Sequence, residues 1–206
     1  MLIPLKCKCG LLRGQVEFSR SMNKRIVCLC NDCQAYAHYL DRVDQMLDAN
    51  GGTDIIPVHP AKIRLTHGVE NLACVRLSDD GVYRWYAGCC KTPIANTPQG
   101  RHPYAGIVTK ILDLGDDSAK LDSALGPVFA RINGKYGIPP LAKGTSQNTP
   151  LRVFLYVIKF MLVGKMKGLR LPSPFTNPET DRPALKPTVL SDPEYYALID
   201  RTGPKR

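Results

Sequence analysis

The chain has 206 residues, of which 44% are hydrophobic and 22% are charged, so its composition is that of a folded globular chain and excludes wholesale disorder. Its 17 Gly and 17 Pro residues favour loops and short strands over a bundle of long helices. Lys and Arg outnumber Asp and Glu by 28 to 18, and the net charge of +10 suits an anionic small molecule, a nucleic acid or a membrane surface.

The sequence contains no segment typical of a secreted or membrane-spanning protein. Residues 1–10 lack the basic start and the apolar core of a signal peptide. The most apolar run, residues 153–163, is interrupted by Lys159 and is much shorter than the ~20 residues needed to span a bilayer. We therefore expect a cytoplasmic protein without a transmembrane segment, in which clustered thiols indicate metal binding rather than disulfide bonds.

Short strands are predicted along the first half of the chain, because apolar and polar residues alternate there with a period of two. The segment 78–81, Ser-Asp-Asp-Gly, is typical of the turn of a hairpin. The predicted strands are residues 12–18, 25–30, 62–66, 72–77, 82–86 and 105–114.

Apolar residues that recur every three or four positions predict helices. The Gly-Pro pair at 126–127 should break or restart one of them, and Pro150 is typical of a helix start. Ser191 and Glu194 form a capping-box pattern. The predicted helices are residues 36–47, 118–134, 151–166 and 195–200. The expected fold is therefore mainly β, with peripheral helices.

All eight cysteines lie in the first half of the chain, and two clusters have the spacing of metal ligands. Cys7 and Cys9 form a C-x-C pair, and Cys28, Cys30 and Cys33 form a C-x-C-x-x-C run. Such short spacings let thiolates converge on one zinc ion at about 2.3 Å. Three ligands leave one position of a tetrahedral zinc ion vacant for substrate, whereas a fourth thiolate would make the site structural. A helix that begins at Cys33 would direct its positive end toward this cluster.

Cys89 and Cys90 directly follow a predicted strand, as in the knuckle of a zinc ribbon. Both are candidate ligands, and we expect Cys90 to reach an ion more readily, because adjacent residues rarely both do. Cys74 is expected to be a small buried hydrophobic residue. The four His residues are scattered without ligand spacing, and none is assigned to metal.

At these residues the sequence resembles the glutathione-dependent formaldehyde-activating enzyme family. The family pattern is C-x-C-G, then C-x-C-x-x-C, then C-x-x-C-G-T-P after a hairpin. Residues 7–10 and 28–33 match the first two elements, and residues 90–93, Cys-Lys-Thr-Pro, resemble the end of the third. In register, the first Cys of the third element falls at Ala87 and its Gly at Lys91, so Cys89 is the candidate for the missing ligand. The resemblance extends over roughly residues 5–115.

The resemblance implies a β-tent fold with two zinc sites. Residues 1–140 would form the zinc-binding domain, and residues 141–206 a helical, Pro-rich extension packed on it. Cys7, Cys9 and the third-element pair would hold a structural zinc ion. Cys28, Cys30 and Cys33 would hold the catalytic zinc ion that receives glutathione. The implied enzyme is a carbon–sulfur lyase of the S-(hydroxymethyl)glutathione synthase type, which joins glutathione to formaldehyde.

The alternative function is a non-catalytic zinc module that binds a protein or a nucleic acid. The basic composition supports it, but the Lys and Arg residues are dispersed and no nucleic-acid motif is present, so a nucleic-acid partner is not expected. For the enzyme, Lys24, Arg25 and Arg101 are candidates for offsetting the charge of a zinc–thiolate centre. The helix at 151–166 either packs on the sheet or serves as an interfacial anchor or a homodimer contact.

Overall fold

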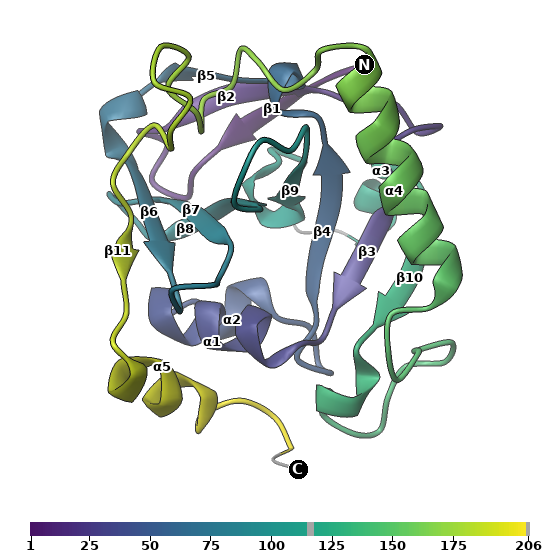
Figure 1. The fold of residues 1–206 in the computed structure, drawn as a ribbon. Helices are drawn as coiled ribbons and strands as arrows, with labels where there is room; N and C mark the ends of the chain where they lie inside the picture. Colours follow the sequence, from purple (N-terminus) through teal and green to yellow (C-terminus); the bar gives the residue numbers. More distant parts are fainter. Residues whose placement is uncertain (115–117, 205–206) are drawn as a thin grey trace.

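The computed structural model describes residues 1–114 and 118–204. These residues form a small and a large sheet, with the helices arranged around them (Figure 1). The small sheet is antiparallel and has the strand order β1-β2-β5. Its strands are β1 (Leu2–Lys6), β2 (Arg13–Glu17) and β5 (Ile63–His67).

The large sheet has the strand order β10-β3-β4-β9-β8-β7-β6-β11. Its strands pair antiparallel except at the two ends, where β10 is parallel to β3 and β11 is parallel to β6. The strands are β3 (Arg25–Cys28), β4 (Thr53–Val58), β6 (Leu72–Arg76), β7 (Tyr83–Ala87), β8 (Thr92–Thr97), β9 (Ala105–Val108), β10 (Val128–Ile132) and β11 (Thr188–Val189).

The helices are short, apart from the 16-residue α4. In the part of the chain that the structure describes, no helix combines the length and the apolar character needed to cross a bilayer. The α-helices are α1 (Asn31–Leu40), α2 (Val43–Met46), α3 (Ser118–Leu125), α4 (Leu151–Met166) and α5 (Asp192–Ile199). Single 3-10 turns are η1 (Pro60–Lys62), η2 (Val69–Asn71), η3 (Thr109–Ile111) and η4 (Gly134–Tyr136).

The two faces of the large sheet contact different parts of the chain, because side chains alternate between faces along each strand. Ile56 and Trp85 pack in the main core with Leu5 of the small sheet. Ile55, the neighbour of Ile56 in β4, packs in a separate cluster with Val153 of α4. The small sheet and α4 therefore cover opposite faces, and α4 lies at one edge of the molecule (Figure 1).

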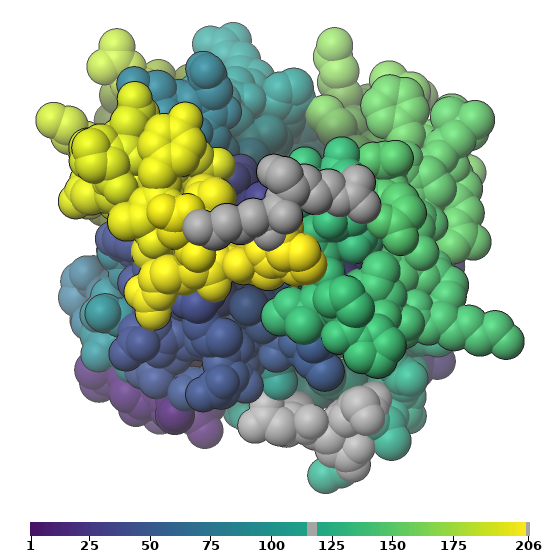
Figure 2. Space-filling view, turned by 90° about the horizontal axis from the view of Figure 1, so that it is seen from below, coloured from purple at the N-terminus to yellow at the C-terminus, as the bar shows by residue number. Residues whose placement is uncertain are grey.

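The C-terminal segment returns to the sheet and then to α1. β11 adds to the edge strand β6, and α5 packs through Tyr195, Leu198 and Ile199 against the cluster that contains α1. The Tyr195 hydroxyl donates a hydrogen bond to Asp32 at 2.9 Å. The segment lies across α1 in the view from below (Figure 2). Residues 205–206, the end of the predicted extension, lie outside the described residues.

The expectation of a mainly β fold with short antiparallel strands, peripheral helices and a helical C-terminal segment is confirmed. The predicted hairpin is β6–β7, and the capping box at Ser191 and Glu194 is present at α5. Pro150 directly precedes α4, as expected.

Two helix predictions were wrong in extent. The helix expected over 36–47 begins earlier, at Asn31, and ends at Leu40, because Asp41 is left-handed with a φ of 54°. The helix expected over 118–134 ends at Leu125, directly before the Gly126-Pro127 pair that was predicted to break or restart it, but the residues beyond the break form strand β10 and not a second helix. The pairing of β10 with β3 is nonlocal and overrides the helical spacing of the apolar residues.

Strands β1, β4 and β8 were not predicted, and each contains a proline: Pro4, Pro57 and Pro93. A proline normally argues against a strand, because it cannot donate a hydrogen bond to the ladder. β1 is the edge of the small sheet, and Pro93 lies where the register of β7 and β8 shifts. The strand expected over 105–114 ends at Val108, where η3 begins.

Candidate metal centres

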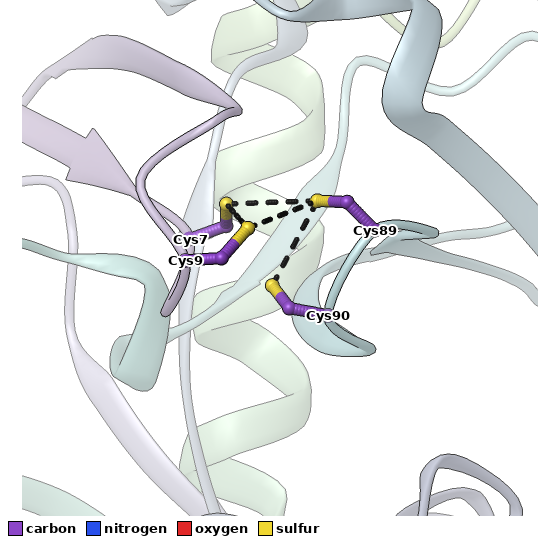
Figure 3. Close-up of side chains that lie close together, drawn as sticks. All are labelled: Cys7, Cys9, Cys89 and Cys90. Atoms are coloured by element: carbon purple, nitrogen blue, oxygen red, sulfur yellow. Dashed lines mark hydrogen bonds between the residues drawn. The ribbon is translucent and has the colours of Figure 1, made fainter.

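Four cysteine side chains point toward one another where two turns meet (Figure 3). Cys7 and Cys9 lie in the turn after β1, and Cys89 and Cys90 lie in the turn between β7 and β8. The sulfur of Cys9 is 3.5 Å from that of Cys7 and 3.4 Å from that of Cys89. The sulfurs of Cys89 and Cys90 are 3.8 Å apart, and all four lie within 4.8 Å of one another. We call these residues the four-Cys group.

Backbone hydrogen bonds shape both turns. Gly10, with a φ of 79°, donates to the carbonyl oxygen of Cys7 at 2.8 Å, in a conformation that L side chains rarely adopt. The Leu12 amide donates to the Cys7 sulfur at 3.2 Å. In the other turn, Lys91 has a φ of 55° and donates to the carbonyl oxygen of Ala87 at 2.7 Å. Each turn therefore presents two sulfur atoms to the same point.

The structure brings both Cys89 and Cys90 into the four-Cys group, although the sequence favoured Cys90. The left-handed residue Lys91, at the position of the family glycine, reverses the chain directly after the pair. Ala87, where the family pattern has its first Cys, is buried inside β7 and pairs with Thr92. Cys89, and not Ala87, therefore contributes a sulfur atom to the four-Cys group.

The separations in the four-Cys group fit a tetrahedral metal ion. Zinc–sulfur bonds of about 2.3 Å place the sulfur atoms of a tetrahedron about 3.8 Å apart. The observed contacts of 3.4 to 3.9 Å agree with this edge length. A disulfide bond needs about 2.05 Å, and every cysteine in the structure is free.

The thiols of the four-Cys group differ in acidity. Burial raises the pKa of Cys7. Burial also acts to raise the pKa of Cys90, but hydrogen bonds outweigh it, the largest from the Thr92 hydroxyl 3.1 Å away, and lower the pKa to about 6. One thiolate is therefore present at neutral pH before any metal binds.

A second group of sulfur atoms lies where β3 leads into α1. Cys28 ends β3, Cys30 is the N-cap residue of α1, and Cys33 lies in the first turn of the helix. The sulfurs of Cys28 and Cys30 are 3.4 Å apart, and all three lie within 4.8 Å of one another. Within residues 1–114 and 118–204, no fourth Cys, His, Asp or Glu joins them. We call these residues the three-Cys group.

Mutual hydrogen bonds and burial hold the thiols of the three-Cys group protonated. The hydrogen bond with Cys30 raises the pKa of Cys28 to about 12, and the hydrogen bond with Cys28 does the same for Cys33. For Cys30, the hydrogen bond with Cys28 lowers the pKa, but the one with Cys33 and burial bring it to about 12. A metal ion that binds here must displace these protons, as thiolate coordination generally does.

A buried arginine lies beside the three-Cys group. The guanidinium of Arg84, in β7, is 4% exposed, lies 3.9 Å from Asp32 and sits over the ring of Tyr36 at 5.1 Å. Burial acts to lower the pKa of Arg84, but electrostatic interaction with Cys33, Cys30 and Asp32 outweighs it and raises the pKa. Its Nη1 atom has no hydrogen-bond partner among the described residues. The side chain is therefore a fixed cation beside the sulfur atoms.

Two neutral side chains complete the surroundings. Asn133 donates a hydrogen bond from its amide nitrogen to the Cys28 sulfur at 3.4 Å. Burial raises the pKa of Tyr104, and electrostatic interaction with Tyr156, Cys28 and Cys33 raises it further. The phenol of Tyr104 is therefore protonated at neutral pH and able to donate a hydrogen bond.

Residues 1–183 match a family model described as "Family of unknown function (DUF6151)". The chain belongs to this family. The DUF6151 match includes both cysteine groups and Arg84, and it ends before β11 and α5. No curated protein matches the chain. A Rhodobacter sphaeroides protein with a crystal structure from structural genomics is similar at 18% identity, with a TM-score of 0.42, covering 61% of this chain and 97% of that chain.

The cations that the sequence suggested for this DUF6151 chain are engaged elsewhere. Arg25 forms ion pairs with Asp54 and Asp122, and Arg101 pairs with Asp181. Arg25 is three positions before Cys28 in β3, and residues an odd number of positions apart in a strand point to opposite faces. Lys24 donates to the carbonyl oxygen of Arg20. Proximity to the cysteines in the sequence therefore did not identify the cation that lies beside the three-Cys group.

Arg84, Tyr104 and Asn133 were missed because strand pairing brings them to the group from distant segments. Arg84 did carry a signal, since it lies between Tyr83 and Trp85 inside a strand whose other residues are apolar or aromatic. A charged residue in such a position has to be paired or near a charged ligand.

A cavity of about 520 Å³ adjoins the four-Cys group. Its lining includes Cys7 and Thr92 together with the cationic residues Lys6, Lys8 and Arg42. The cysteines of the three-Cys group do not line it. The cavity therefore adjoins the four-Cys group at Cys7 and does not adjoin the three-Cys group.

Proposed function

We propose that this DUF6151 protein is a zinc-dependent enzyme that binds a thiol such as glutathione at the three-Cys group and adds it to formaldehyde or another small aldehyde. The observation that carries the proposal is the three-Cys group itself, with three converging sulfur atoms and no fourth protein ligand among the described residues. The cysteine pattern shared with the glutathione-dependent formaldehyde-activating enzymes, with their β-tent fold, supports the substrate class.

Zinc bound by Cys28, Cys30 and Cys33 would supply an open position that ionises the substrate thiol at neutral pH. The three thiolates supply a charge of −3 against the +2 of the ion. A substrate thiolate brings the centre to −2, and the guanidinium of Arg84 offsets part of that charge. The Asn133 amide holds the sulfur of Cys28 by its hydrogen bond. These residues bind and orient, and Arg84 stabilises the ionised form of the substrate.

The reaction joins the substrate sulfur to the carbonyl carbon of the aldehyde. A carbon–sulfur bond forms, the carbon–oxygen π bond breaks, and the oxygen takes up the proton that the thiol released. The phenol of Tyr104, which burial and the neighbouring sulfur atoms keep protonated, is the candidate donor of a hydrogen bond to that oxygen. No oxidant or reductant is required.

The four-Cys group is assigned to a second, structural zinc ion. Four sulfur ligands would fill the tetrahedral coordination of a zinc ion, so no position would remain for a substrate. The group connects the turn after β1 to the turn between β7 and β8, more than 80 residues apart. Free thiols and thiolate-bound zinc suit the reducing conditions of the cytoplasm, where we place the protein.

The test combines glutathione and carbon-13-labelled formaldehyde with the zinc-loaded chain and follows the hydroxymethyl signal by NMR. The parent chain should accelerate adduct formation, and Cys33→Ser should return the rate to that of the spontaneous reaction. Cys74→Ala is the control, because Cys74 is buried in the main core outside both groups. A parent chain with two zinc ions that gives no acceleration would refute the reaction of glutathione with formaldehyde and favour the non-catalytic zinc module.

A further inference from the structure

Helix α4 carries a row of large apolar side chains on its outer surface. Leu151, Leu155, Ile158 and Leu162 follow one another at spacings of four, three and four residues, so they lie on one face of the helix. All four are exposed, Leu162 by 55%, and at the end of the helix Met166 is 86% exposed. Exposed apolar patches of this kind mark interaction sites.

The opposite face of α4 is tightly docked on the large sheet. Phe160 stacks on the ring of His59 at 3.9 Å between centroids. A Cβ at Gly164 would lie 2.6 Å from the same ring, so the helix backbone approaches as closely as a glycine allows. Val153 is buried in the cluster with β3 and β10. The helix is thus held by its inner face, and folding of the chain leaves the outer row uncovered.

The stretch of sequence that contains α4 has charged residues of one sign only. Residues 123–178 contain eight Lys or Arg residues and no Asp or Glu. Four of these cations belong to the helix or directly follow it: Arg152, Lys159, Lys165 and Lys167. Arg131 and Arg170 of this segment pair with Asp48 and Asp181, whereas the four cations of the helix and its end lie beside the exposed apolar row.

We infer that α4 docks on the surface of an anionic phospholipid bilayer. The apolar row would enter the boundary between headgroups and acyl chains, and the flanking cations would contact the lipid phosphates, as in other basic amphipathic helices. The helix would lie in the plane of the surface, because 16 residues are too few to span it.

A second copy of the chain fits the exposed face of α4 less well than an anionic bilayer does. A twofold dimer places the same patch on both sides of the interface. Here that would bring two cationic helices together with no acidic residue from 123–178 of either copy between them. A nucleic acid would engage the cations but would leave the leucine row in water. An anionic bilayer satisfies both the charge and the apolar row.

The test is flotation of the metal-loaded full chain with vesicles of phosphatidylcholine, alone or mixed with phosphatidylglycerol. We expect binding to the mixed vesicles, weakening as salt is raised. The double variant Leu155→Asp/Leu162→Asp should lower the partition coefficient at least about tenfold, since it removes apolar contact and adds repulsion. Both sites are exposed, so circular dichroism and zinc content should be unchanged.

The control is Val69→Asp, an exposed apolar residue in η2 far from α4 in the sequence, and this variant should float like the parent. The inference is overturned if the folded parent binds neither kind of vesicle, or if the double variant floats as well as the parent. It is also overturned if sedimentation shows a dimer that the double variant dissociates while vesicles are not bound, since α4 would then be a contact between copies. The readout is independent of enzyme activity.

Discussion

The four-Cys and three-Cys groups both consist of cysteine side chains, but the backbone brings their sulfur atoms together in different ways. The three-Cys group comes from six consecutive residues at the junction of a strand and a helix. The four-Cys group joins two turns that only the folded sheets bring close. The local group has three candidate ligands among the described residues and lies beside a buried cation, whereas the nonlocal group has four candidate ligands.

The proposed division between a structural and a catalytic group rests on this contrast. A metal ion that links distant turns adds stability by connecting parts of the chain that would separate on unfolding. An ion held within six residues would connect little of the chain, and three ligands would leave it a position for a substrate. The predictions below test this division, from the largest expected effect to the smallest.

Metal binding at the three-Cys group should depend steeply on pH. Because the pKa values of Cys28, Cys30 and Cys33 are each raised to about 12, all three thiols are protonated at neutral pH in the metal-free chain. Binding displaces three protons, so affinity should rise with pH by up to about a thousandfold per unit. Chelator competition across the neutral range measures this slope, and the Cys28→Ser variant identifies the site. A slope below about tenfold per unit would contradict the prediction.

Cys9→Ser in the four-Cys group should lower the free energy of unfolding by on the order of 3 kcal/mol in the presence of zinc. The reason is that the variant weakens the link between the two turns. Urea unfolding measures the loss. Cys30→Ser in the three-Cys group should cost less, and Cys74→Ala is the control for loss of a buried thiol outside both groups. Equal losses of unfolding free energy for Cys9→Ser and Cys30→Ser would contradict the assignment of the structural role to the four-Cys group alone.

Arg84→Met should weaken metal binding at the three-Cys group about 10- to 100-fold, because the buried cation that offsets the thiolate charge is lost. Binding at the four-Cys group should not change. Arg76→Met is the matched control, since Arg76 sits over the ring of Tyr83 at 5.6 Å much as Arg84 sits over Tyr36. Equal effects of the two variants in chelator competition would show that general packing, not charge, is responsible.

Tyr195→Phe should have the smallest effect, a loss of about 1 kcal/mol in unfolding free energy. The variant removes the hydrogen bond that α5 donates to Asp32, directly beside the three-Cys group. Hydrogen exchange should then rise at the start of α1 and stay the same at the four-Cys group. Tyr196→Phe is the control, because Tyr196 is 62% exposed. Identical exchange in both variants would indicate that the hydrogen bond does not hold α5 in place.

Local patterns in the sequence predicted the elements whose signal is contained in a few neighbouring residues. The β6–β7 hairpin, the capping box of α5 and the start of α4 at Pro150 belong to this class. Where pairing with a distant strand determines the secondary structure, the local pattern was misleading. Residues 128–132 have helical spacing but form a strand beside β3, and the proline-containing strands β1, β4 and β8 are held by their neighbours in the sheets.

The sequence by itself determined that Cys28, Cys30 and Cys33 converge, because three sulfur atoms within six residues at a helix start need no help from the rest of the chain. Only the tertiary structure decided that Cys89 and Cys90 both join Cys7 and Cys9, and that Arg84 is the cation beside the three-Cys group. Strand pairing across the two sheets sets those positions, and it depends on contacts between residues far apart in the chain.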